Sequence, residues 1–137
     1  MKLKKNYLFF NVNNIHQAIE VISICKTKKI LPIVCIKFFL VEGFGPDWII
    51  EFINLLLKEF NKRDFKILVD CRKNYGLFIN LVQQKIDFLQ VNADPNTLSR
   101  LNNIANKNKV IVNPKISIIN LANIKNIESK IQKIYNF

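Results

Sequence analysis

Short runs of apolar residues alternate along this chain with segments in which apolar residues recur every three or four positions. The runs have the length and the branched side chains of strands, whereas the recurring positions form one face of a helix. The pattern predicts five strand–helix pairs. The expected strands are 7–12, 30–39, 66–70, 87–91 and 110–113.

Residues typical of helix starts support this placement. Asn14 is expected as an N-cap, with Gln17 at capping-box spacing. Asp94 and Pro95 form a second start. The segment 41–47, which holds two of the three glycines, is expected as a loop that ends where Pro46 opens the next helix.

The alternation indicates a single α/β domain over residues 1–137 with a mostly parallel sheet. Five βα units fit a flavodoxin-like three-layer sandwich, which is the fold we expect. Part of a (β/α)8 barrel has the same local pattern and is the alternative. Such a part would have open sheet edges that need a cover.

The tail carries an apolar stripe that predicts a helix over 118–137. The stripe consists of Leu121, Ile124, Ile127, Ile131 and Ile134, with further apolar surface at Ile116, Ile118 and Ile119. One stripe can be covered by the sheet. Because a small domain offers little sheet area, we predict that part of this helix forms a homodimer contact.

The net charge of +11 raises the question of a nucleic-acid partner. Lysine outnumbers arginine 18 to 3, and the lysines are spread along the whole chain. Codons of an A/T-rich genome would produce the same bias. We therefore expect solvated surface charge, and nucleic-acid binding is kept only as an alternative. No apolar run is long enough for a membrane span, and no signal peptide is expected.

Cys25, Cys35 and Cys71 form no C-x-x-C pair. Their odd number argues against a disulfide framework and for a reducing, cytoplasmic setting. His16 is the only histidine, so a histidine-based metal site or catalytic triad is not expected. No metal or cofactor is predicted.

Polar residues follow each expected strand, and ligands bind at the carboxyl ends of parallel strands. These residues are Asn11, Asn13, Lys37, Glu42, Asp70, Arg72, Asn92, Asn113 and Lys115. We expect a ligand site to be built from them.

Asp70 is the strongest single candidate, because it directly follows an apolar strand. A carboxylate there suits a base, a metal ligand or an anchor for a substrate hydroxyl. The structural alternative is that it caps the next helix or pairs with Arg72 or Lys115. Lys37 or Lys115 would be the amine of a Schiff-base enzyme, although a lysine at a strand end often extends to water.

Three function classes follow. The leading one is a small-molecule-binding or regulatory domain whose site is lined by Asp70, Arg72, Asn92 and Lys115. The second is a lyase or aldolase that uses Lys37 or Lys115. The third is nucleic-acid binding through the basic surface.

The segment from Leu31 to Pro114 resembles a family of small uncharacterised alphaproteobacterial proteins. Its members have an apolar strand ending in Leu-Asp-Cys-Gly, a Gly-rich helix start and a second strand. Val69-Asp70-Cys71 and Gly76 match that pattern, and Arg72 stands where a glycine is expected. The resemblance implies an α/β fold and a role for Asp70, and it implies no reaction.

A response-regulator receiver domain is also similar in size, with an Asp ending the third strand and a Lys after the fifth, here Asp70 and Lys115. The acidic pair that holds magnesium in that family is replaced by Asn11, Asn13 and Asn14. Mg²⁺ would be held poorly without those carboxylates. Phosphoryl transfer to Asp70 is therefore not expected.

Overall fold

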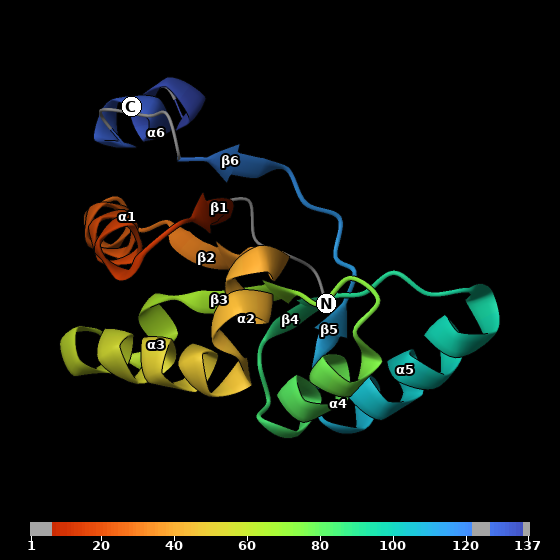
Figure 1. The fold of residues 1–137 in the computed structure, drawn as a ribbon. Helices are drawn as coiled ribbons and strands as arrows, with labels where there is room; N and C mark the ends of the chain where they lie inside the picture. Colours follow the sequence, from red (N-terminus) through yellow and green to blue (C-terminus); the bar gives the residue numbers. More distant parts are fainter. Residues whose placement is uncertain (1–6, 122–126, 136–137) are drawn as a thin grey trace.

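The computed structural model describes residues 7–121 and 127–135, which form a curved parallel sheet and its helices (Figure 1). The strands are β1 (Tyr7–Val12), β2 (Leu31–Ile36), β3 (Lys66–Asp70), β4 (Phe88–Gln90), β5 (Ile111–Val112) and β6 (Ile118–Asn120). The helices are α1 (Ile15–Thr27), α2 (Phe38–Phe44), α3 (Pro46–Glu59), α4 (Tyr75–Gln83), α5 (Pro95–Lys107) and α6 (Ile127–Tyr135). A short 3₁₀ turn, η1 (Lys62–Asp64), precedes β3.

The predicted α/β class and parallel sheet are confirmed. The strand order is β5-β4-β3-β2-β1-β6, and every neighbouring pair is parallel. The sheet is open, with β5 and β6 at its edges, so it is not a closed barrel. An open parallel sheet with crossover helices is consistent with the flavodoxin-like class.

The two faces of the sheet carry unequal layers. From β1 to β5 each crossover moves on by one strand in the same direction. Crossovers of one hand then place their helices on one face, as in the wall of a barrel. Figure 1 shows α1, α3, α4 and α5 along one side of the curved sheet, with the chain after β5 passing on the other side.

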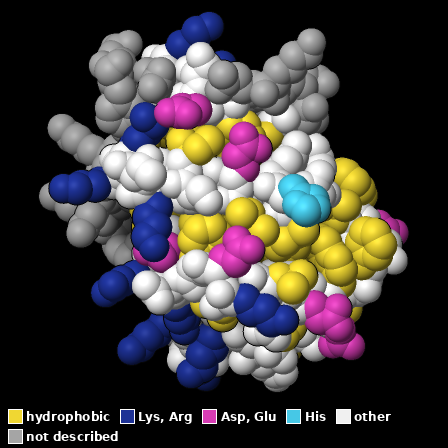
Figure 2. Space-filling view, turned by 90° about the vertical axis from the view of Figure 1, so that its left-hand side faces the viewer, with side chains coloured by type: hydrophobic (Ala, Val, Ile, Leu, Met, Phe, Trp, Pro, Cys, Tyr) yellow, Lys and Arg dark blue, Asp and Glu magenta, His cyan; other side chains and the backbone are white. Residues whose placement is uncertain are grey.

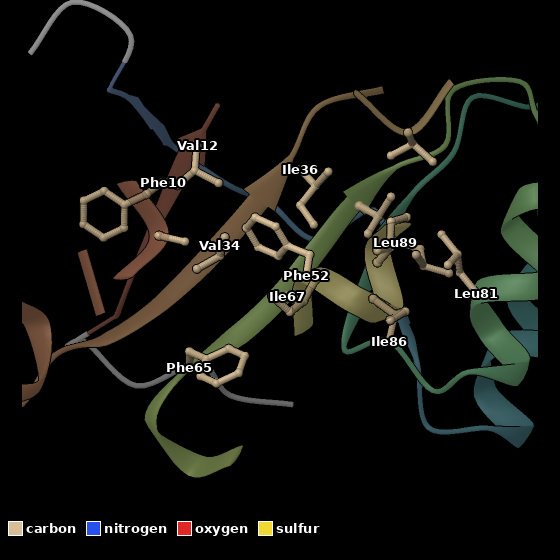
Figure 3. Close-up of a cluster of buried hydrophobic side chains, with 14 of the residues drawn as sticks. Phe10, Val12, Val34, Ile36, Phe52, Phe65, Ile67, Leu81, Ile86 and Leu89 are labelled. Atoms are coloured by element: carbon tan, nitrogen blue, oxygen red, sulfur yellow. The ribbon is translucent and has the colours of Figure 1, made fainter. Parts of the chain in front are cut away.

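Alternation along the strands divides the core into two clusters. The larger cluster packs Phe10, Val34, Ile67 and Leu89 against the helices, including Phe52 of α3 (Figure 3). The smaller cluster lies on the opposite face, which we call the inner face. It consists of Phe9, Ile33, Cys35, Leu68 and Phe88, with Ile111 and Ile116 packed against it.

The helix starts predicted from single residues are confirmed. Asn14 Oδ1 accepts a hydrogen bond from the Gln17 amide at 2.9 Å. Gln17 Oε1 accepts from the amide of Asn13 rather than from that of the cap residue itself. Asp94 caps α5, with Pro95 at its first position.

The prediction for 30–47 was wrong at its centre. The strand ends at Ile36, and Phe38–Phe44 is the helix α2, where a strand end and a loop were expected. This helix buries Val41 and ends on Gly45, whose φ of 85° suits a glycine. Gly45 donates its amide to the Val41 carbonyl at 2.7 Å. Pro46 begins α3 as predicted.

The prediction of one helix over 118–137 was also wrong. Residues 118–120 form β6, because the free edge of β1 offers ladder hydrogen bonds that a helix could not use. The part of the tail that the structure describes as helical begins at Ile127. Of the apolar stripe, Leu121, Ile127 and Ile131 are buried within the chain, and Ile124 lies outside the described residues. The homodimer contact stays a prediction, which light scattering tests.

None of the helices in residues 7–121 and 127–135 has the length and apolar character that a membrane span requires.

Candidate functional site

Polar residues from neighbouring strands form a row at the carboxyl edge of the inner face. Asp70 of β3 is paired with Gln90 of β4. Lys37 lies one residue beyond the paired Ile36 and Val69, which places it beside Asp70. Asn13 lies one residue beyond the paired Val12 and Ile36, beside Lys37. Because strand residues alternate between faces, the row points to the same face as the smaller core cluster.

The layer beneath this row is mostly apolar. Two residues earlier on each strand lie Asn11, Cys35, Leu68 and Phe88, which are in register across the four strands. Cys35, Leu68 and Phe88 are buried, and Asn11 is half-buried. The edge therefore has polar side chains above a layer of mostly buried, apolar side chains, which we call the floor. This arrangement is typical of small-molecule sites.

A cavity of about 370 Å³ adjoins the row at the ends of β3, β4 and β5. It is lined by Asp70, Arg72, Gln90, Val91, Asn92, Asn113 and Pro114. Four of the residues expected at the site are therefore brought together: Asp70, Arg72, Asn92 and Asn113. Asn13 and Lys37 continue the row towards β1.

Asp70 is half-buried and makes a local turn. Its Oδ1 accepts a hydrogen bond from the amide of Arg72 at 3.0 Å. The cap of the following helix is Asn74, which accepts from the amide of Leu77 at 3.0 Å. Within the described residues Asp70 forms no ion pair, so neither structural alternative, the helix cap or the pairing with Arg72 or Lys115, is found.

The guanidinium of Arg72 lies over the ring of Phe38, 5.1 Å from its centroid. This contact holds the charge at the rim of the cavity and away from the Asp70 carboxylate. Arg72 itself has a φ of 46°, a left-handed conformation that the turn through Asp70 imposes.

Lys37 is half-buried at the end of β2. Its Nζ donates to Asn13 Oδ1 at 3.2 Å and lies 5.8 Å from the ring centroid of Phe39. The ammonium is therefore held towards β1. It is placed to meet an anionic or carbonyl group above the row.

Asn113 has a structural role that its sequence position did not reveal. Its Oδ1 accepts from the amide of Val91 at 2.8 Å, and its Nδ2 donates to the Val91 carbonyl at 2.9 Å. The carboxamide thus continues the ladder between β4 and β5 and is not free to bind a ligand in the same way. Asn92 is exposed, and its carbonyl accepts from the Tyr75 hydroxyl at 3.1 Å.

Two of the expected site residues lie outside both this cavity and the polar row with its floor. Glu42 is on α2 and lines a separate hollow of about 320 Å³ between the α2–α3 turn and α4. Lys115 is exposed and does not line either hollow.

Sequence reasoning missed Gln90. It is the strand partner of Asp70 and lines the cavity. The signal was available, because Gln90 is a polar residue two positions before Asn92 in an otherwise apolar strand, and period-two alternation puts both on one face.

Cys71 is not suited to act as a nucleophile. Burial raises the pKa of its thiol to about 12, and the neighbouring Asp70 carboxylate adds to the shift. A thiol with this pKa stays protonated near neutral pH. In the described part of the chain, no three His, Cys, Asp or Glu side chains are grouped so that they could hold a metal ion.

Comparisons with protein-family models, with curated proteins and with solved structures find no significant match to this chain.

Proposed function

We propose that this chain is a small-molecule-binding or regulatory α/β domain with its site at the carboxyl edge of the inner face. One observation supports this most directly. Asn13, Lys37, Asp70 and Gln90 form a continuous polar row above an apolar floor, and the row opens into a cavity of about 370 Å³.

The chemistry of the row suggests a class of ligand. Asp70 would accept hydrogen bonds from a hydroxyl or an amine, and Gln90 can both donate and accept. Lys37 continues the row and Arg72 lines the cavity, so both supply positive charge to the site, which favours a carboxylate or phosphate on the same ligand. The proposed ligand is therefore a small anion that also carries a hydroxyl or amino group.

The test replaces Asp70 by Asn, with Asp47→Asn as a matched control that removes the same charge from an exposed position on α3. Ligand that copurifies with the protein would be identified by native mass spectrometry. We expect Asp70→Asn to lose the ligand and the control to keep it. Stability should change by less than about 1 kcal/mol, because an Asn oxygen can replace Oδ1 in the turn.

Two results would contradict the proposal. One is a ligand that both variants retain equally. The other is a loss of more than about 2 kcal/mol in the free energy of unfolding of Asp70→Asn, which would assign Asp70 to a structural network.

A second candidate is a lyase or aldolase that uses Lys37. Its support is the position of Lys37, a half-buried residue that lies beside Asp70 in the row and whose Nζ is held by Asn13 Oδ1 at 3.2 Å. In such an enzyme the amine would add to a substrate carbonyl and lose water to form an imine. Borohydride would reduce that imine to a stable secondary amine. Absence of an adduct on Lys37 across a panel of carbonyl compounds would exclude this candidate, with the exposed Lys115 as an internal reference.

Three buried cysteines without a disulfide support a reducing, cytoplasmic location for either function.

A further inference from the structure

The charged residues are divided unequally between the two edges of the sheet. Helices in a parallel α/β fold run opposite to the strands, so their C-terminal ends lie at the amino edge. The segments 26–29, 58–66, 85–87 and 107–109 lie there, each between a helix and the following strand. We call these four segments the amino-edge rim.

The rim holds ten Lys and Arg residues and three acidic ones. The corresponding segments at the carboxyl edge, 37–47, 70–73, 91–94 and 113–115, hold four basic and four acidic residues. Figure 2 shows many of the Lys and Arg side chains along the left and lower margins of the face it presents and hydrophobic side chains at its centre and right, with Asp and Glu scattered over the face. The fold thus gathers onto one edge lysines that are dispersed along the sequence.

Two ion pairs join neighbouring rim segments. Lys26 Nζ lies 3.4 Å from Asp64, and Lys66 Nζ lies 3.6 Å from Asp87. These contacts make the rim a connected surface while neutralising only part of its charge. Lys62, Lys85 and Lys109 are exposed and form no ion pair with other described residues.

Three rim lysines occupy positions that suit another residue better. Lys29, Lys85 and Lys109 have φ values of 57°, 60° and 60°, each just after a helix. Gly or Asn is usual in this left-handed conformation. Codon bias does not account for the choice, because the chain has 19 Asn residues and Asn codons are as A/T-rich as Lys codons. The helix dipole favours cations here, but it would not require Lys26, Lys28 and Lys29 all to be lysine before β2.

The rim has the shape of a row. Helices α1, α3, α4 and α5 pack side by side, with contacts between each consecutive pair. At 8–10 Å per helix, the row extends over roughly 25–30 Å. A row of point charges of this length matches a linear polyanion better than a small ligand.

Apolar side chains lie beside the charges of the rim at the end of α3, where Leu57 is 42% exposed and lines a hollow of about 350 Å³ with Lys62 and Lys85. Between the other helices and strands the apolar residues are covered, since Ile30, Ile86 and Val110 are buried, with 4%, 4% and 2% of their surface exposed. They therefore offer little apolar surface that could enter a bilayer. Lysine-rich surfaces contact phosphates as point charges and without the fixed geometry that base recognition uses. We propose that the amino-edge rim binds the phosphate backbone of a nucleic acid without sequence preference.

The experiment measures binding of the full-length protein to a labelled duplex and to a labelled single strand by fluorescence anisotropy, from about 50 to about 200 mM salt. A double variant, Lys62→Gln with Lys85→Gln, removes two exposed rim charges. The control, Lys73→Gln with Arg100→Gln, removes two exposed charges elsewhere and gives the same net charge. We expect the rim variant to raise Kd at least about fivefold and to lower the slope of log K against log salt by about two. The control should change Kd by less than about twofold.

An equal effect of the two double variants would overturn the proposal, because it would show attraction to net charge rather than a rim contact. So would binding to vesicles of phosphatidylcholine and phosphatidylserine without binding to either nucleic acid. Asp70→Asn should leave nucleic-acid binding unchanged, so the outcome is independent of the proposed ligand site.

Discussion

The rings of Phe9 and Phe88 contact each other edge to face, with centroids 6.0 Å apart and an interplanar angle of 68°. Phe9 is on β1 and Phe88 on β4, and two strands separate them. In a flat sheet, strands three places apart would lie about 14 Å from each other. The contact therefore requires the sheet to curl strongly towards its inner face. It forms part of the floor below the candidate site.

Replacing Phe88 by Ala should destabilise the protein by about 3–5 kcal/mol, because it removes a buried ring that closes the curl. Urea denaturation followed by circular dichroism measures the change. Phe39→Ala is the matched control, since the Phe39 side chain is 57% exposed, and it should cost less than about 0.5 kcal/mol. Equal effects of the two substitutions would contradict the importance of the curl.

The order of the strands up to β5 and of the helices α1, α3, α4 and α5 could be predicted, because strands and helices there have distinct periods and helix starts carry Asn14, Pro46 and Asp94. The boundary after β2 could not. The apolar run continues from Ile36 into Phe38, and only the curvature of the sheet and the burial of Val41 decide where the strand stops. β6 was missed because three residues are too few to show a period, and pairing with β1 is a long-range effect.

Of the four residues expected from strand ends to line one site, Asp70, Arg72 and Asn92 line the same cavity and Lys115 does not. Side-chain roles within it could not be predicted, because they depend on hydrogen bonds across strands. The gathering of charge on one edge of the sheet could not be predicted either, because it also depends on which residues the fold brings together. Lysines that are dispersed along the sequence fall at or just after the C-terminal ends of α1, α3, α4 and α5, and the parallel topology then places those ends together.

Asn113→Ala should destabilise the protein by about 2–3 kcal/mol. The substitution removes two hydrogen bonds to Val91. It also places alanine at a φ of 49°, a left-handed conformation that Asn tolerates better than Ala. Asn113→Gly loses the same hydrogen bonds but relieves the conformational strain, so its cost should be smaller. Thermal unfolding of both variants separates the two contributions, and a Gly variant less stable than the Ala variant would contradict this explanation.

Alkaline pH should destabilise the protein through its thiols. Burial raises the pKa of Cys25, Cys35 and Cys71 from 9.0 to about 12 each. Above pH 9 the unfolded chain loses these protons while the folded chain keeps them. Stability contributed by the neutral thiols is therefore complete below pH 9 and falls as pH rises towards 12.

The contribution of one thiol can be isolated. Each buried thiol should add about 1.4 kcal/mol per pH unit to the decline. Cys71→Ala should make the decline between pH 9 and 12 shallower by about that amount, whereas other titrating groups affect both proteins alike. Denaturation at a series of pH values measures the two slopes. Identical slopes would show that the Cys71 thiol ionises as easily in the folded chain as in the unfolded one.

Lys109→Gly should stabilise the protein by about 1 kcal/mol, although it removes a side chain. Lys109 has a φ of 60° at the end of α5, where a Cβ is unfavourable and glycine is not. Arg100→Gly is the matched control. It removes the same charge from an exposed position inside α5, where glycine should cost about 1 kcal/mol. Opposite signs in urea denaturation would confirm that the rim keeps lysine at the expense of stability, and a loss in both variants would contradict it.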